Sequence, residues 1–300
     1  MIEKHLIRSE ADWLEMRKQD VTASDIAALV GKHEFLSHYG LWLLKAGNIL
    51  PEVESDPMSR GKLLEPVIIG LVKKLHPDWT VISANDYYYR DAGARIGATP
   101  DLLAMAPSDP VVIDAKTVDL WTWKKEWDDG DSIPARVYMQ MQVQAALTGA
   151  DEAYVAVLVW GGRLDFRMLP VKVDPSVYGQ LKAEVKGFWL SIANDKPPAP
   201  DFGRDYELLR KVYAQTGEII DLSGDNEILE MRAEYRACAA SEKLCKDEKN
   251  EIKARLLQKM GGANVAIFNG AEIAACKTIP KKGYSVEPTS YLDVRFRGKD

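Results

Sequence analysis

The sequence predicts an α/β fold followed by a C-terminal helical and small β extension. An apolar run at residues 111–118 has the composition of a buried strand, and helical patterns lie on both sides of it. A proline-rich stretch at 196–200 then interrupts the chain. Beyond it the sequence is dense in Glu, Lys, Arg, Ala and Leu. We therefore expect two domains, residues 1–200 and 201–300.

Helical signals dominate the first quarter of the chain. Ser9 opens a first helix as a capping-box variant, with Asp12 in the place of the usual Glu or Gln. Thr22 to Asp25 starts a second, short helix that should stop near Gly31. The expected helices in this part cover residues 9–18, 22–31, 35–47 and 61–75.

Strands should follow, and then two further helices. The last of three strand-like runs enters an aromatic stretch at 121–127. Pro134 begins a helix, Gly161-Gly162 marks a hairpin, and Asp174 caps another helix. The expected strands are 79–90, 94–105, 111–118, 154–160 and 163–173, and the helices are 134–149 and 175–194.

The extension should be a long exposed helix or helical hairpin at 226–260, ended by Gly261-Gly262. A small β-unit should follow and close with the segment Arg295 to Asp300. Three cysteines, at positions 238, 245 and 276, are too few for a disulfide framework. No secretory signal and no membrane-spanning stretch is evident, so a reducing, cytoplasmic setting is expected.

Composition alone favours an acidic protein without a nucleic-acid partner. The net charge is −6, which argues against a surface coated with nucleic-acid-binding residues. A charged partner is still compatible with a local positive groove, since the groove and not the total charge makes the contact.

Asp114 and Lys116 are the most informative pair. Along a strand they share one face with Val112, while Ile113 and Ala115 share the other. Buried charges are costly unless they pair or bind something. A structural ion pair is the plain reading, but we expect two residues this close on one strand to be poorly placed to pair tightly. With Asp101 upstream, the pattern is that of carboxylates that hold a divalent cation and a lysine that positions water.

Glu65 is a further candidate, because on a helix it lies on a stripe of small and apolar neighbours. Its alternative is a partly exposed acid near a helix start. Gln140 and Gln144 share a helix face and Gln142 points elsewhere; taken in isolation, the three are better explained by an ordinary amphipathic helix. We keep all three as candidates, Gln140 as a catalytic residue and Gln142 and Gln144 as DNA contacts.

Two more constellations could contact nucleic acid. Arg17, with Thr22 and Ser24 at a helix start, could bind phosphate, although simple capping explains the hydroxyls. An aromatic and basic cluster follows the Asp-x-Lys strand and could stack on bases or belong to the core and surface. Its members are Trp121, Trp123, Trp127, Lys124 and Lys125.

These motifs together resemble the YqaJ-type viral recombinase nucleases, which are similar to lambda exonuclease within the PD-(D/E)xK superfamily. The resemblance covers about residues 8 to 195. The motifs that carry it are Gly-x-x-x-Glu at 61–65, Thr-Pro-Asp at 99–101, Asp-x-Lys at 114–116 and Tyr-x-Gln-x-Gln at 138–142.

The resemblance implies a restriction-endonuclease-like core, with a central mixed β-sheet flanked by helices. It implies Mg²⁺, with Mn²⁺ as the alternative, held by Glu65, Asp101, Asp114 and the carbonyl of Ala115. Lys116 would orient the attacking water, and Gln140 matches the family's first glutamine. Arg17 and Ser24 match residues that grip a terminal 5′-phosphate, and Trp13 matches a nearby aromatic.

The implied activity is a 5′→3′ exonuclease on double-stranded DNA ends in phage-type recombination. The alternatives are a DNA endonuclease of this fold and a non-catalytic DNA-binding recombination scaffold. Implied partners are copies of the chain in a ring, such as a trimer, and a single-strand annealing protein, in a bacterial host that carries the phage or prophage.

Three residues depart from the family pattern. Asp114 stands where Glu is more frequent, Leu102 follows Asp101 in place of Gly, and Thr117 stands where Cys is frequent. The iron–sulfur relatives need a fourth cysteine, so we expect no cluster.

Overall fold

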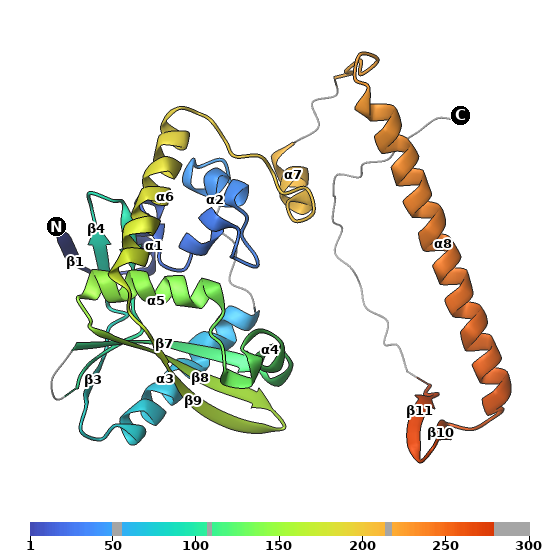
Figure 1. Ribbon diagram of the computed structural model, residues 1–300, viewed down its shortest axis with the longest axis horizontal. Helices are drawn as coiled ribbons and strands as arrows, with labels where there is room; N and C mark the ends of the chain where they lie inside the picture. Colours follow the sequence, from blue (N-terminus) through green and yellow to red (C-terminus); the bar gives the residue numbers. More distant parts are fainter. Residues whose placement is uncertain (50–55, 107–109, 214–217, 279–300) are drawn as a thin grey trace. The chain divides into compact units, whose positions relative to one another are not determined.

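The computed structural model describes residues 1–49, 56–106, 110–213 and 218–278 (Figure 1). It forms two compact units, Met1–Val212 and Tyr213–Asp300. The first unit extends twelve residues past the boundary expected at residue 200, because helix α7 (Tyr206–Val212) belongs to it. The β-segment expected at Arg295 to Asp300 lies outside the described residues.

The first unit is built on a five-stranded mixed sheet of order β3-β6-β7-β8-β9. Strands β7 and β8 are parallel and the other neighbours are antiparallel. This confirms the predicted α/β class with a mixed sheet. The bounds are Thr80–Ser83 for β3, Leu102–Met105 for β6, Pro110–Asp119 for β7, Glu152–Gly161 for β8 and Arg163–Val171 for β9.

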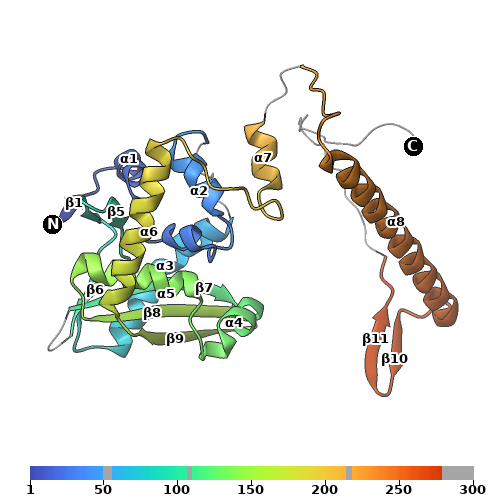
Figure 2. The same ribbon diagram turned by 45° about the horizontal axis from the view of Figure 1, so that its top comes forward.

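Two helices cover the two faces of this sheet (Figures 1 and 2). Helix α3 (Asp56–Leu75) packs Ile68 and Val72 on the face that contains Val111 and Ile113 of β7. Helix α5 (Ala135–Thr148) packs on the face that contains Val112 and Val118. Because side chains alternate along a strand, Asp114 and Lys116 belong to the α5 face.

A second sheet divides the strand runs expected at 79–90 and 94–105. Its order is β1-β4-β5-β2, with bounds Ile2–Leu6, Tyr87–Asp91, Ile96–Ala98 and Val21–Thr22. Each expected run is cut by a turn, the second of them at Pro100, which supplies no backbone N–H. The two halves of each run therefore enter different sheets.

A helical layer lies on the outer side of α5. It contains α2 (His38–Lys45), the 3₁₀ helix η1 (Ile26–Val30) and α6 (Pro175–Ala193). Val143 and Leu147 of α5 share a core with Leu41, Ile26 and Val185. Figure 2 shows α5 between this layer and the sheet. Helix α5 is thus buried on two sides, so its polar side chains must find hydrogen-bond partners inside the protein.

Helix α1 (Glu10–Gln19) begins as predicted at Ser9, whose hydroxyl accepts from the Asp12 N–H at 3.1 Å. The short helix expected at 22–31 is wrong in part: Thr22 ends strand β2, and only residues 26–30 form the 3₁₀ turn η1. Gly31 ends it with φ +67°.

The second unit contains one long helix, α8 (Glu227–Met260), and a hairpin of β10 (Val265–Phe268) and β11 (Ala271–Ala275). Asn269 and Gly270 connect the two strands, both at positive φ. An Asn-Gly pair suits a two-residue hairpin turn that needs this conformation. Within the ranges that are described, no helix is both long and apolar enough to cross a bilayer.

Candidate active site

Asp114 and Lys116 lie near the middle of β7, where strand pairing changes. Residues up to Ile113 pair with β6, whereas β8 continues alongside to Asp119. The Lys116 Nζ lies 2.5 Å from Asp114 Oδ2, so our expectation that the two were poorly placed to pair is wrong. The lysine side chain is long enough to fold back along its own face of the strand. Asp114 is almost fully buried.

Two glutamines of α5 hold the other oxygen of Asp114. The Nε2 atoms of Gln140 and Gln144 donate to Asp114 Oδ1 at 2.7 Å and 3.0 Å. Residues four apart share a helix face, so both amides reach one carboxylate. Among the described residues, Gln144 Oε1 is buried and has no hydrogen-bond partner. The two glutamines fix the orientation of Asp114 and leave its Oδ2 directed at Lys116.

Gln142 does not belong to this group, which corrects its candidacy as a DNA contact. Its Nε2 donates to the Lys172 carbonyl at 2.8 Å, and the Asp174 N–H donates to its Oε1 at 2.8 Å. It is buried on another face of α5, with both of its polar atoms bonded inside the protein. Its role is to attach the start of α6 to α5.

Asp101 completes the edge of β7. The Ala115 N–H donates to Asp101 Oδ2 at 2.7 Å, just beyond Ile113, the last residue that pairs with β6. The carboxylate thus takes the place of a strand partner. Burial and, second, the nearby negative charge of Asp114 together raise the pKa of Asp101 to about 8. Repulsion between the Asp101 and Asp114 carboxylates favours a bound cation.

Glu65 lies on α3 and approaches the same place from the other side. Asn85, in the turn between β3 and β4, donates to Glu65 Oε1 at 2.8 Å. Burial raises the pKa of Glu65, the bond from Asn85 opposes the rise, and the charge of Asp114 adds to it. The charge of Glu65 in turn contributes to the raised pKa of Asp101. The three carboxylates therefore share one electrostatic environment.

Lys116 is the cation inside this acidic group. Burial lowers its pKa, but the charges of Asp114 and Asp101 outweigh burial, and the pKa of Lys116 is raised. It is therefore protonated at neutral pH. In the described part of the chain, no three His, Cys, Asp or Glu side chains are gathered closely enough to ligate an ion as they stand. The ammonium group of Lys116 supplies the local positive charge instead.

The donor chemistry nonetheless fits a hard divalent cation. Glu65, Asp101 and Asp114 offer only oxygen atoms, the donors that Mg²⁺ and Mn²⁺ prefer. Asp114 Oδ2 is buried and, apart from its ion contact with Lys116, accepts no hydrogen bond of good geometry from the described residues. Ala115, whose carbonyl was a predicted ligand, stands between Asp114 and Lys116 on β7.

A second polar group surrounds Arg17 of α1. Arg17 Nη2 donates to Ser24 Oγ at 3.3 Å, and the hydroxyls of Ser24 and Thr22 are 3.0 Å apart. The guanidinium lies 4.7 Å from the ring centre of Trp13. Trp13 in turn donates to Thr99 Oγ1 at 3.0 Å, two residues before Asp101. The predicted phosphate residues are thus brought together, and Trp13 connects them to the carboxylate strand.

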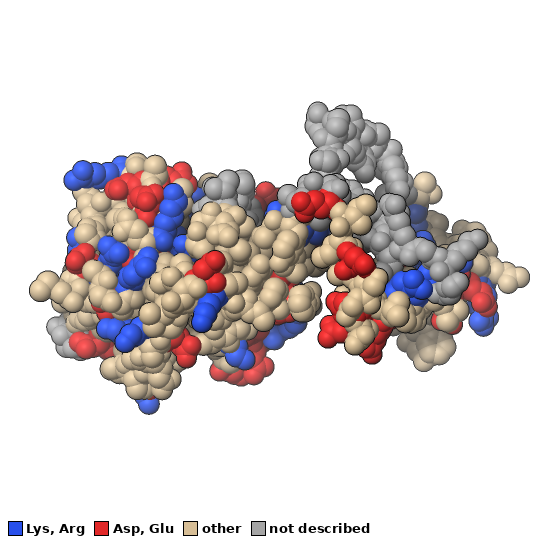
Figure 3. Space-filling model, turned by 90° about the horizontal axis from the view of Figure 1, so that it is seen from above, with Lys and Arg blue, Asp and Glu red and all other residues tan. Residues whose placement is uncertain are grey.

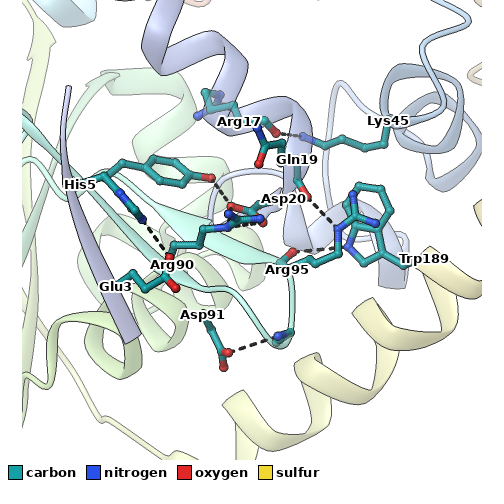
Figure 4. A network of polar contacts seen from close by, with 12 residues as sticks. Glu3, His5, Arg17, Gln19, Asp20, Lys45, Arg90, Asp91, Arg95 and Trp189 are labelled. Carbon is teal, nitrogen blue, oxygen red and sulfur yellow. Dashed lines mark hydrogen bonds and ion pairs between the residues drawn. The ribbon is translucent and has the colours of Figure 1, made fainter. Parts of the chain in front are cut away.

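Buried charges fix the position of Arg17. Lys45 Nζ donates to the Arg17 carbonyl at 2.9 Å (Figure 4). It also donates to Asp25 Oδ2 at 3.2 Å. Burial raises the pKa of Asp25, but the charges of Arg17 and Lys45 outweigh it and the pKa is lowered. Asp20, fully buried, pairs with Arg90 of β4 at 2.8 Å. The segment that carries Thr22 is therefore attached on both sides.

One cleft of about 660 Å³ is lined by the Arg17 group and by part of the acidic group. Its lining includes the phosphate group of Arg17, Thr22 and Ser24 together with Glu65 and Asp101 of the acidic group. Gln140 and Gln144 also line it, and Asp114 lies behind them, bonded to both. The lining also includes Trp13, Lys62, Asn85 and Thr99.

The aromatic cluster after β7 divides into core and surface. Asp119 caps the short helix α4 (Leu120–Glu126), which the sequence did not predict. Trp123 and Trp127 are buried and stacked 5.7 Å apart, so Trp123 is wrong as a DNA contact. Trp121 is 67% exposed and Lys124 is exposed, and both stay candidates.

Sequence reasoning missed Asn85, Lys45 and Asp25. Asn85 and Lys45 have no motif; they act by contact with Glu65 and Arg17 from distant segments. Asp25 directly follows the Thr-Ala-Ser turn, which is a usable signal, because an acid beside an expected phosphate site is anomalous.

On the face drawn in Figure 3, basic and acidic side chains are interspersed. Any positive field on this face is therefore local.

Comparison with known proteins agrees with this architecture. Residues 12–151 match the model of the YqaJ-like viral recombinase domain. The chain is 26% identical over 238 residues to the uncharacterized protein YqaJ of Bacillus subtilis, covering 75% of this chain and 71% of that protein. The structure is similar to an alkaline exonuclease from Laribacter hongkongensis, with a TM-score of 0.52 and 21% identity over 62% of this chain and 94% of the other. Residues 12–151 are thus similar in sequence to the YqaJ-like viral recombinase domain, and the solved exonuclease shows the same fold.

Proposed function

We propose that this chain is a divalent-metal-dependent deoxyribonuclease that degrades double-stranded DNA from its 5′ ends in phage-type recombination. Mg²⁺ is the expected metal, with Mn²⁺ as the alternative. The domain match and the exonuclease-like fold support a nuclease of the phage type. We infer a site of action in the cytoplasm of a bacterial host, and assembly into a ring with a single-strand annealing protein as partner.

One observation carries the proposal: Glu65 and Asp101 of the acidic group line the same cleft as the Arg17 group. Carboxylates alone could bind a cation for structural reasons, and a lone arginine with two hydroxyls could be a helix cap. Side by side, they suit a substrate that has a phosphate at its end and another one to be cleaved nearby. A DNA 5′ terminus is such a substrate.

The residues divide the chemistry between them. Glu65, Asp101, Asp114 and the Ala115 carbonyl would hold the cation, which supplies a Lewis acid and a more acidic bound water. Lys116, protonated and next to Asp114, can donate a hydrogen bond to a water or a phosphate oxygen. Gln140 and Gln144 keep Asp114 in one orientation. Arg17, Ser24 and Thr22 can donate to the terminal phosphate, with Arg17 supplying a charge-assisted bond.

The first test is cleavage of linear duplex DNA with Mg²⁺ and with EDTA. We expect metal-dependent cleavage that Lys116→Ala abolishes while DNA binding in EDTA is retained. Lys74→Ala is the matched control, since Lys74 is an exposed lysine of α3 outside the cleft. Cleavage that is indifferent to EDTA, or that survives Lys116→Ala unchanged, contradicts the proposal.

The direction of attack needs a separate test. Duplexes with a 5′-phosphate should be degraded faster than those with a 5′-hydroxyl, and closed circular DNA should survive. Cleavage of the circle would favour the endonuclease of the same fold. DNA binding without cleavage under any metal would favour the non-catalytic scaffold.

A further inference from the structure

Two tryptophans are exposed at the same end of the main sheet. Trp160, near the end of β8, is 37% exposed, and Trp121, at the start of α4, is 67% exposed. Leu120 and Leu164 beside them are also exposed, at 40% and 67%. We call these four residues, with Arg60 and Lys125, the Trp121–Trp160 surface. An apolar surface of this kind on a protein exterior indicates a binding site.

The strand register places both tryptophans at one end of the sheet, with Trp160 on the face that α3 covers and α4 on the face that α5 covers. Trp160 lies opposite Asp119 in the parallel pair β7 and β8, and α4 begins at the next residue. Leu120 packs on Gly161, where an added Cβ would lie 2.8 Å from the Leu120 Cβ. Gly161 also has φ +148°, which side chains rarely adopt. The strand end and the helix start are therefore held in contact.

A cation lies over each tryptophan ring. The Arg60 guanidinium of α3 is 4.9 Å from the Trp160 ring, and Lys125 Nζ is 4.6 Å from the Trp121 ring. The acidic turn at 128–131 is beside Trp123, as Gly130 contacts that ring. Trp123 is two positions from Trp121 and so faces the opposite side of α4. Each exposed ring thus has a cation on its face, while the Asp119 carboxylate, which accepts from the Trp121 N–H at 3.0 Å, lies at the start of α4.

The surface is close to the candidate active site. Lys116 pairs with Val157 of β8, and Trp160 is three residues further along that strand. At a rise of about 3.3 Å per residue, this separation is about 10 Å along the sheet. Arg60 and Glu65 also lie on the same helix, α3. A nucleic acid that occupies the cleft can therefore reach the surface.

We propose that the Trp121–Trp160 surface binds single-stranded DNA next to the site of cleavage. Aromatic rings stack on base faces, which are free in a single strand and hidden in a duplex, while the cations match the phosphates. A surface for duplex backbone would need the cations without the exposed apolar groups. The inference depends on the proposed function, because digestion of one strand leaves the other single.

The test measures binding by the full chain in EDTA, where no cleavage is expected. The probes are an oligothymidylate of about 20 nucleotides, which cannot pair with itself, and a blunt duplex of the same length. Variants are Trp160→Ala, Trp121→Ala and Trp160→Phe, which keeps a ring. Phe202→Ala is the matched control, since Phe202 is a 78% exposed aromatic outside both the surface and the cleft.

We expect each tryptophan-to-alanine change to raise the Kd for the single strand at least about fivefold, because that is the usual effect of losing one base-stacking contact. The duplex Kd should change less than about twofold, because phosphate contacts dominate it. Trp160→Phe should recover most of the affinity, and Phe202→Ala should behave as the parent chain.

An unchanged single-strand Kd in both alanine variants overturns the inference and leaves the surface for a protein partner. Equal losses for single strand and duplex, or failure of the parent chain to bind the single strand, also overturn it. The proposed nuclease is judged separately, by metal-dependent cleavage of duplex by the parent chain and Lys116→Ala. Either idea can therefore fail without the other.

Discussion

Replacing Gln144 by leucine should weaken metal binding while leaving the free energy of unfolding nearly unchanged. The change removes one amide donor from Asp114 Oδ1, at 3.0 Å, and leaves the bond from Gln140 in place. A hydrogen bond to a charged group contributes about 1.5–3 kcal/mol. The same change removes the buried Gln144 Oε1, which is without a partner among the described residues and costs about 1–3 kcal/mol to bury. The two effects oppose each other, so the free energy of unfolding should change little.

The effect on the metal should be large. Loss of a residue that orients a metal ligand typically costs about 10–100-fold in metal affinity or activity. Gln144→Leu should therefore raise, by about that factor, the Mg²⁺ concentration for half-maximal cleavage. Mn²⁺ binding measured by calorimetry or by its paramagnetic signal, without DNA, should weaken in parallel.

Gln142→Leu is the matched control on the same helix. It removes the bonds to the Lys172 carbonyl and the Asp174 N–H and leaves both groups without their partner. We expect a loss of about 2 kcal/mol in the free energy of unfolding, and a Tm lower by about 4–8 °C for a unit of this size. Its metal dependence should not change.

The reasoning is refuted if Gln144→Leu leaves the half-maximal Mg²⁺ concentration unchanged, or if Gln142→Leu shifts it by as much. Thermal unfolding in EDTA is recorded for both variants, so that a loss of folded protein is not mistaken for a loss of metal.

Three further predictions follow from the cleft and its supports. Arg17→Gln should bring the cleavage rates of 5′-phosphorylated and 5′-hydroxyl duplexes together, and a preserved preference would exclude Arg17 as the phosphate residue. Asp25→Asn should destabilise the protein at neutral pH; because the pKa of Asp25 is lowered on folding, its contribution is present above its unfolded pKa of about 3.9 and is lost as pH falls through the folded value. Denaturant unfolding near pH 7 and near pH 3 should show the difference between variant and parent shrink in acid, and a constant difference would contradict the assigned cause. A chain ended after Val212 should keep cooperative unfolding and metal-dependent cleavage, since the first unit has its own core; loss of both would show that the second unit is needed for folding.

Local patterns determined much of this protein. The apolar alternation of 111–118 was enough to place Asp114 and Lys116 on one face of a strand, and the spacing of the glutamines was enough to separate Gln142 from its neighbours. Caps at Ser9 and Asp174 and the turn at Gly161-Gly162 fixed helix starts and a hairpin. These features depend on residues a few positions apart, so the sequence displays them directly.

Only the tertiary structure decided which groups meet. Nothing local indicates that Lys116 folds back on Asp114, that Gln140 and Gln144 both reach Asp114, or that Asn85 holds Glu65. The division of the runs at 79–90 and 94–105 between two sheets, and the burial of Trp123 beside an exposed Trp121, depend on which surface each element packs against. Burial and pairing arise when segments distant in the sequence come into contact. The local sequence pattern does not indicate which distant segments will do so.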